Sequence, residues 1–393
     1  MRPMTLLPVL SRLVRFCACL ALCCCLCPVR AGAVETHNVG FRTLGYWGGE
    51  NGIRLDINVW YPTIRREKDL QFASWSIRAA HNGKPVEGRF PLIVVSHASP
   101  GMRYSYHDTC YSLASLGFVV AAPTHPRDCM DNMDLLYTWP QLATRARELG
   151  AAIDVLLDDR DISNSIDANR IGLLGFGSGG AAALLLGGAL PTCDGWAGYC
   201  DTVPQGGAYC NTWARARMDK LCTQLPLKKS LANTRFKAIA VAQPAFGMLF
   251  TGDAFRYFYP PLLIMAAERE RISGYGRHAE AIARALGGKA RYVRLKGADL
   301  GSLMAVCPDN LMDDLPELCR SVKPKERQAI HDAMHDALGD FFLKYLGNSD
   351  NLPHIPEPPD LTPAAVKEDK PQPAGKAKQP ERRRARPAAR ERR

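Results

Sequence analysis

The chain has 393 residues, 47% of them hydrophobic, and a formal net charge of +11 at pH 7. A chain of this length and apolar content can bury one large core, which excludes a short scaffold that depends on cross-links. The charge lies at the two ends, because residues 1–33 carry +4 and residues 351–393 carry +5, which leaves +2 for residues 34–350. We therefore expect one nearly neutral domain of catalytic size between two basic ends.

Residues 1–33 are predicted to be a secretory signal peptide. Arg2, Arg12 and Arg15 form a basic start, residues 16–29 are apolar, and residues 31–33 read Ala-Gly-Ala, a small-residue cleavage site. The apolar stretch is too short for a membrane-spanning helix. We expect an exported protein, periplasmic or secreted, whose mature chain has no transmembrane span; a retained anchor is the alternative.

From residue 34 to 350, strand patterns and helix patterns alternate. A hairpin is predicted over residues 41–62, and a closing helix with one apolar face over about residues 325–346. Between them, strands are expected at 91–97, 118–126, 171–176, 236–245, 261–268 and 290–297, and helices at 142–159 and 181–190. Such alternation is typical of the α/β class, in which helices cover both faces of a mostly parallel sheet.

The segment RIGLLGFGSGGAAALLL, which begins at Arg170, carries the clearest functional motif. A strand, a cluster of glycines and a helix of small residues form a nucleophile elbow when a nucleophile lies between two glycines. In that register Gly175 and Gly179 are the two glycines, and Gly177 occupies the nucleophile position. The serine of the motif, Ser178, comes one residue later.

Several segments in chain order carry a resemblance to a known family. They are VWYP, VVSHASPGMRYSYHD, FVVAAPTHP, RIGLLGFGSGG, AAERERI and KGADLGSLMAVCPD, followed by the closing helix. Together they resemble the exported α/β hydrolases known as predicted dienelactone hydrolases, which are relatives of the platelet-activating-factor acetylhydrolases. The resemblance spans about residues 40–347. It implies the α/β-hydrolase fold and a lid over about residues 190–233.

The same resemblance assigns three catalytic roles. It places the nucleophile at Gly177, the base at Leu300 and the acid near Glu270. Glycine has no hydroxyl and leucine cannot accept a proton, so two of the three roles are vacant. We expect a catalytically inactive hydrolase homologue that binds a ligand or partner. The alternative is a serine ester hydrolase in which Ser178 acts from a shifted elbow.

The backbone N–H donors of such a site do not depend on the catalytic side chains and can remain when those side chains are lost. In the family, the loop corresponding to His97, Ala98 and Ser99 supplies one oxyanion donor, and the backbone N–H at Ser178 supplies the other. His125 belongs to a loop at the rim, and it is a candidate base for Ser178 together with His97. The remaining pocket would suit a small carbonyl-bearing or carboxylate-bearing ligand.

No cofactor and no metal are expected. His331 and His335 have the i, i+4 spacing of a metal site, but no third ligand is apparent near them in the sequence. We therefore expect both histidines to lie on a solvated helix face.

Eight cysteines remain after the signal, and an even number in an exported protein predicts disulfides. We expect Cys307 to pair with Cys319, and the four cysteines of the lid leave three pairings open. The full set is Cys110, Cys129, Cys193, Cys200, Cys210, Cys222, Cys307 and Cys319.

Residues 351–393 form a tail rich in Pro, Ala, Lys and Arg, with 11 basic and 6 acidic residues. Because the tail has no apolar periodicity, we expect it to be disordered. It is either simply solvated or an electrostatic tether to an anionic envelope surface, polymer or nucleic acid. The sequence indicates no oligomeric state.

Overall fold

The computed structural model describes residues 36–47, 52, 54–72, 74–203, 207–225, 229–269, 277–348 and 352–357. The predicted signal peptide, Glu270 and all of the tail except residues 352–357 lie outside the described residues. Within the described part of the chain, no helix is both long and apolar enough to cross a membrane.

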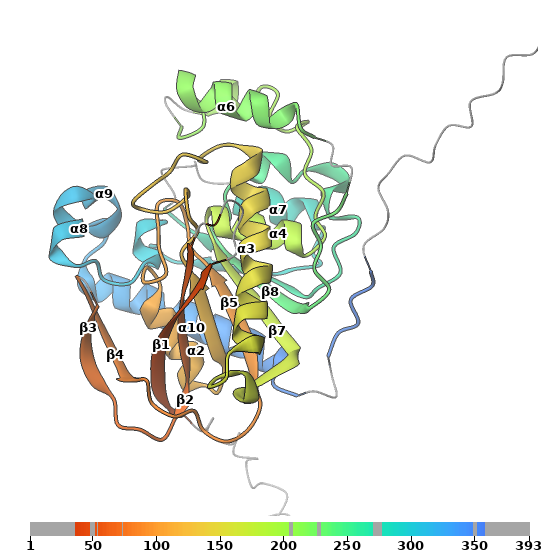
Figure 1. Cartoon of the computed structure of the whole chain (residues 1–393). Coiled ribbons are helices and arrows are strands. Elements are labelled where there is room, and N and C mark those ends of the chain that lie inside the picture. Colours follow the sequence, from red (N-terminus) through yellow and green to blue (C-terminus); the bar gives the residue numbers. More distant parts are fainter. Residues whose placement is uncertain are drawn as a thin grey trace, which may run out of the picture.

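Ten described strands form one sheet in the order β10-β9-β8-β7-β5-β6-β2-β1-β4-β3 (Figure 1). Their bounds are β1 Asn38–Trp47, β2 Arg54–Thr63, β3 Lys68–Phe72, β4 Trp75–His81, β5 Phe90–Ser96, β6 Val119–Pro123, β7 Ile166–Phe176, β8 Phe236–Ala242, β9 Leu262–Ala267 and β10 Arg291–Leu295. Strands β5 to β10 pair in parallel, whereas β2 runs antiparallel to both β6 and β1. The mostly parallel sheet that the sequence predicts is confirmed.

The helices lie on both faces of this sheet. The longer ones are α2 His107–Ser115, α3 Trp139–Asp158, α4 Ser178–Leu186, α6 Thr212–Cys222, α7 Ala279–Ala285 and α10 Pro324–Leu346, and the short ones are α5 Tyr199–Thr202, α8 Asp309–Asp314 and α9 Pro316–Cys319. Single turns of 3-10 helix cover Ser163–Ser165, Gly247–Leu249, Gly252–Phe255 and Gly301–Leu303. Helices α3, α4 and α7 share one apolar core with the sheet, and α2 and α10 share the other.

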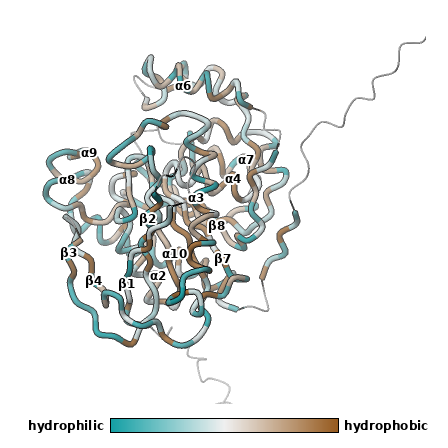
Figure 2. The backbone as a smooth tube through the Cα atoms, viewed as in Figure 1, coloured by the Kyte–Doolittle hydropathy of each residue, from teal (hydrophilic) through white to brown (hydrophobic). Residues whose placement is uncertain are grey.

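Strand β7 shows how one sequence serves both cores. Ile171 and Leu173 belong to the α3–α4 core, whereas Leu174 and Phe176 belong to the α2–α10 core. Successive strand residues point to opposite faces, so a continuously apolar strand must be covered on both sides. Figure 2 shows the hydrophobic residues gathered along the central strands and the helices beside them.

The predicted hairpin and closing helix are confirmed, and β3 and β4 add an edge that the sequence patterns do not indicate. Strands β1 and β2 pair from Asn38↔Thr63 to Trp47↔Arg54. Strand β4 then pairs in parallel with β1, and β3 pairs antiparallel with β4.

Three disulfides are present among the described residues, and the prediction of disulfides is confirmed for six of the eight cysteines that follow the predicted signal peptide. Cys307 pairs with Cys319 as expected, and in the segment predicted to be a lid Cys193 pairs with Cys222 and Cys200 with Cys210. The prediction is wrong for the remaining two.

Cys110 and Cys129 are free and buried. Cys110 faces the α2–α10 core from helix α2, whereas Cys129 lies in the loop after β6 and exchanges two backbone hydrogen bonds with Asn132. The two thiols therefore belong to different elements, and each is buried without a disulfide partner.

Candidate active site

Gly177 forms the whole connection between β7, which ends at Phe176, and α4, which begins at Ser178. Its φ is 51° and its ψ is −117°, a backbone conformation that residues with a side chain rarely adopt. The turn is fixed to the end of β8, because Gly177 N–H donates to the Ala242 carbonyl at 3.1 Å and Ala245 N–H donates to the Gly177 carbonyl at 2.8 Å. The sharp strand-to-helix turn expected from the motif is therefore present at Gly177.

A Cβ atom on Gly177 would face Leu300. It would lie 3.9 Å from Leu300 Cδ1 and 2.9 Å from the Cβ of Ala98. Leu300 caps the short turn Gly301–Leu303 that follows β10. The structure thus brings together the two positions that the family resemblance assigns to nucleophile and base, and neither position carries a reactive group.

Ser178 is the first residue of α4 and is 4% exposed. Its Oγ lies 2.6 Å from Ser99 Oγ, and Ser99 Oγ lies 2.6 Å from Asp128 Oδ1. Because an ionised carboxylate only accepts, Ser99 donates to Asp128 and must accept the hydrogen of Ser178. The Ser178 hydroxyl is therefore bonded to another hydroxyl and not to a general base.

An ion pair that the sequence did not indicate holds this arrangement. Arg145 Nε lies 2.5 Å from Asp128 Oδ2, and both side chains are almost completely buried. Arg145 also donates to Ser99 Oγ and to the His97 carbonyl, and Gln141 donates to both carboxylate oxygens of Asp128. Burial of a charged group requires such pairing, so this cluster is the structural support of the 97–99 loop.

Gln141, Arg145 and Glu148 have a signal in the sequence. They lie at i, i+4 and i+7 of helix α3, which places them on one face of the helix. Leu142 and Leu149 lie beside them in the helix and are completely buried. Polar residues at helical spacing among buried leucines could have identified a buried polar cluster, although not its partners.

Neither the ring of His97 nor that of His125 is hydrogen-bonded to Ser178. His97 Nε2 accepts from the His125 N–H at 3.1 Å, so its Nδ1 is the protonated nitrogen and donates to the Ala98 carbonyl at 2.7 Å. Burial, with the nearby positive charge of Arg145 as a second cause, holds the pKa of each histidine well below its ordinary value. Both rings are therefore neutral structural groups.

His125 is the centre of a chain in the order serine, histidine, carboxylate. Ser96 Oγ lies 2.8 Å from His125 Nε2, and His125 Nδ1 lies 2.7 Å from Glu148 Oε2. This order matches a catalytic triad. However, Ser96 and His125 are completely buried, and Arg145 donates to Ser96 Oγ, so the described arrangement gives no substrate access to that hydroxyl.

A small cavity of about 60 Å³ lies over the turn. Its walls include Gly177, Ser178 and Leu300, with Tyr209 of the predicted lid and Tyr137 opposite. Pockets that bind drug-sized ligands have volumes of about 300–1,000 Å³. In the described conformation the cavity therefore admits only a small group.

The expectation of a solvated face for His331 and His335 is wrong. Asp108 of α2 lies against them, so that one ligand atom from each of the three residues lies within 4.8 Å of the others. His331 Nδ1 lies 2.5 Å from Asp108 Oδ2, and His331 Nε2 lies 2.8 Å from the Ser302 carbonyl. Burial opposes a charge here, but the hydrogen bond to Asp108 outweighs it and raises the pKa of His331.

Two comparisons with known proteins concern the fold of this chain. The family model of platelet-activating factor acetylhydrolase, isoform II, matches residues 63–138. A solved structure, the ferulic acid esterase from Streptomyces cinnamoneus, aligns with a TM-score of 0.53 and 16% identity, covering 86% of this chain and 96% of that one. The chain has the α/β-hydrolase fold. The two likenesses support a hydrolase of the acetylhydrolase and dienelactone hydrolase-like kind.

Proposed function

We propose that this protein is an exported α/β-hydrolase homologue that has lost catalysis and acts by binding. The observation that carries the proposal is the glycine at the strand-to-helix turn, whose Cβ position faces Leu300. Hydrolysis through an acyl intermediate needs a nucleophilic side chain and a base in hydrogen-bond reach of it. Residue 177 offers no such side chain, and Leu300 offers no base.

Two features support export. The described residues form three disulfides. Disulfides form and persist in oxidising compartments and are rare in the reducing cytosol. The predicted signal peptide, which lies outside the described residues, provides the route.

What the cavity retains is its polar backbone. Ser178, the first residue of helix α4, lines the cavity, and its N–H lies at the positive end of the helix dipole. A carbonyl or carboxylate is the chemistry that such an end attracts. The volume of about 60 Å³ limits the occupant to one such group unless the wall of Tyr209 moves.

The alternative, an ester hydrolase using Ser178, has one observation in its favour, which is that Ser178 lines the cavity. Against it stand the hydrogen bond from Ser178 to Ser99 and the engagement of His97 and His125 elsewhere. A serine hydroxyl is a weak nucleophile unless an adjacent base accepts its proton, and a hydrogen bond to another hydroxyl does not provide that base.

The test is labelling of the mature protein with a fluorophosphonate probe, read by intact mass beside a serine esterase of known activity. We expect no adduct on this protein and complete labelling of the esterase. An adduct that disappears in Ser178→Ala would overturn the proposal in favour of the shifted elbow. An adduct that disappears in Ser96→Ala would overturn it in favour of the buried serine, histidine and glutamate chain.

A further inference from the structure

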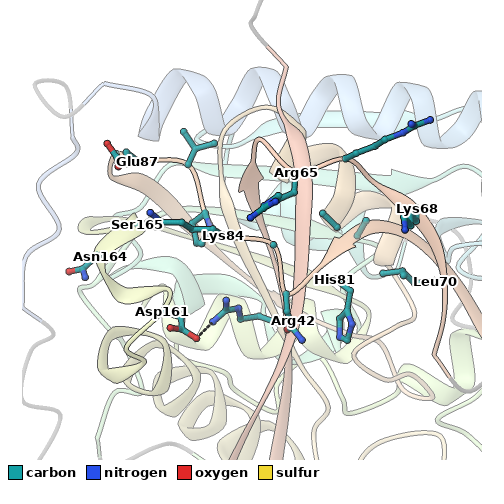
Figure 3. Close-up of a pocket in the computed structure, with 18 of the residues that line it drawn as sticks. Arg42, Arg65, Lys68, Leu70, His81, Lys84, Glu87, Asp161, Asn164 and Ser165 are labelled. Atoms are coloured by element: carbon teal, nitrogen blue, oxygen red, sulfur yellow. Dashed lines mark hydrogen bonds and ion pairs between the residues drawn. The ribbon is translucent and has the colours of Figure 1, made fainter.

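A second and much larger hollow lies at the opposite edge of the sheet. Parallel strands β5 and β7 end at Ser96 and Phe176, next to the elbow, and begin at Phe90 and Ile166. The lining of the hollow includes residues 79–88, 160, 161, 164 and 165, which precede those beginnings in the chain, and the hollow measures about 1020 Å³. We call it the amino-edge cleft (Figure 3).

The amino-edge cleft is strongly basic. Among its described lining residues, two are acidic, Glu87 and Asp161, and six are basic. The basic residues are Arg42, Arg65, Arg66, Lys68, Lys84 and Arg160. The cleft therefore carries a net charge of +4, whereas the whole of residues 34–350 carries only +2.

Arg42 differs from the other five basic residues, because the fold itself needs it. Its guanidinium is buried on the floor, where Nη1 lies 3.0 Å from Asp161 Oδ2 and Nε lies 3.3 Å from the Tyr61 hydroxyl. The Tyr61 hydroxyl in turn donates to the Gly83 carbonyl at 2.7 Å. Arg42 thus links β1 to the segment after α3 and to the loop after β4.

The other five, Arg65, Arg66, Lys68, Lys84 and Arg160, are exposed, and their side-chain nitrogens make no hydrogen bond or ion pair with any described residue. Figure 3 draws Arg65, Lys68 and Lys84 around the same hollow, where only Arg42 is joined to a carboxylate. Like charges gathered in a concave surface repel one another, and the walls concentrate their field in the hollow. Since no hydrogen bond or ion pair to a described residue compensates this repulsion, the gathering of the five cations points to a ligand.

We propose that the amino-edge cleft binds a soluble ligand that carries several phosphate or carboxylate groups. Guanidinium groups match both kinds of anion in pairs of hydrogen bonds, and the lysines add point charges. A volume of about 1020 Å³ is far larger than one anion needs, so the ligand extends past several cations.

Other occupants fit the surface less well. A flat anionic membrane cannot enter a concave cleft, and none of the described lining residues is Phe, Tyr or Trp, on which nucleic acid bases would stack. The tail of this chain carries 11 basic and 6 acidic residues, so a cleft of the same sign repels it.

The inference goes beyond the proposed function and does not depend on it. The cleft lies at the other edge of the sheet from Gly177, and none of its described lining residues also lines the small cavity. If Ser178 were shown to be a catalytic nucleophile, the proposal for the amino-edge cleft would still stand.

The experiment titrates the full-length mature protein by calorimetry with two probes, inorganic tripolyphosphate and trigalacturonate, at low and at physiological salt. The cleft variant combines Arg65→Ala, Lys68→Ala and Lys84→Ala. The control variant removes three exposed lysines elsewhere, by Lys220→Ala, Lys289→Ala and Lys325→Ala. Thermal melts of both variants verify that they are folded.

We expect the wild type to bind at least one probe, and the preferred probe identifies phosphate or carboxylate as the anion. The cleft variant should weaken binding about tenfold, because it removes three of the cations that contact the anion and each solvated ion pair contributes modestly. The control variant should stay within about twofold. The proposal is overturned if neither probe binds at low salt, or if the control variant loses as much affinity as the cleft variant.

Discussion

The surroundings of the small cavity at Gly177 and the amino-edge cleft differ in how their charged side chains are paired. At the carboxyl edge of the sheet, Arg145 and Asp128 are almost completely buried and fully hydrogen-bonded. At the amino edge, Lys84 and Arg65 are exposed and unpaired among the described residues. A buried charge must be paired for the protein to fold, whereas a solvated charge can remain free for a ligand. The paired cluster is therefore evidence about stability, and the unpaired one is evidence about binding.

The largest expected effect tests the buried half of this comparison. Arg145→Met leaves the Asp128 carboxylate buried without its charged partner, which should lower the free energy of unfolding by about 3–5 kcal/mol. The matched control is Arg147→Met on the same helix, where the arginine is exposed and bonded to Thr144. Urea unfolding of both variants measures the difference, and equal losses would show that the Asp128 network does not support the fold.

The second effect concerns the turn beside that network. Gly177→Ser should lower the free energy of unfolding by about 1–3 kcal/mol, because a side chain at a φ of 51° is strained and its Cβ would approach Ala98. The single variant should remain inactive.

Addition of Leu300→His places a base beside the new hydroxyl. The double variant should hydrolyse a small activated ester at a rate that neither single variant reaches, since nucleophile and base act as one unit. An ester assay of the two single variants and the double variant measures this. A wild type that already hydrolyses the ester, and loses the activity with Ser178→Ala, would contradict the assignment of the vacant nucleophile to Gly177.

The third effect is a loss of stability at acidic pH, caused by the buried histidines near the elbow. The pKa values of His97 and His125 lie well below their ordinary value in the folded state, because burial and then Arg145 disfavour the charged rings. The unfolded chain therefore binds protons that the native chain does not, so stability should fall as the pH drops below about 6.5. His107 and His335, whose pKa values are also lowered, first by burial, act in the same direction.

The measurement is the slope of the free energy of unfolding between pH 7 and pH 5. In His125→Gln the slope should be smaller by at most about 1.4 kcal/mol per pH unit, the contribution of one proton. His331 has the opposite sign: burial opposes its charge but Asp108 raises its pKa, so its contribution is lost as the pH rises above about 6.5. An unchanged slope in His125→Gln would mean that the pKa of His125 is the same in the folded and the unfolded protein.

The smallest expected effect tests the exposed half. The combined Arg65→Ala, Lys68→Ala and Lys84→Ala variant should unfold within about 0.5 kcal/mol of the wild type, because surface substitutions away from packed contacts change stability little. Urea unfolding without ligand measures this. A loss of several kcal/mol would show that these cations serve the fold, and the contrast between the two edges would disappear.

The central strands and the sharp turn at Gly177 could be predicted because both depend on short stretches of sequence. The continuous apolar run of residues 171–176 is typical of a strand that is covered on both faces, and a glycine cluster between that strand and an apolar helix indicates a sharp turn. Cys307 and Cys319 were predictable for the same reason, since they flank one short loop.

The networks could not be predicted, because they join distant segments. Whether Arg145 points toward Asp128 or toward solvent depends on how α3 packs on the sheet, which its own sequence does not specify. The amino-edge cleft combines Arg42, Lys84 and Arg160 from three separate parts of the chain. Strands β3 and β4 were missed because they form a sheet edge with alternating or mostly exposed residues and no continuous apolar run.

The two disulfides of the lid are nested, since Cys200–Cys210 lies within the loop closed by Cys193–Cys222. A protease that cuts one peptide bond between Cys193 and Cys222 would therefore release no fragment, because the outer bridge still joins the two new ends. A nicked lid would stay attached to the protein as two linked pieces. In a compartment that contains proteases, this segment can be cleaved once and still remain in place.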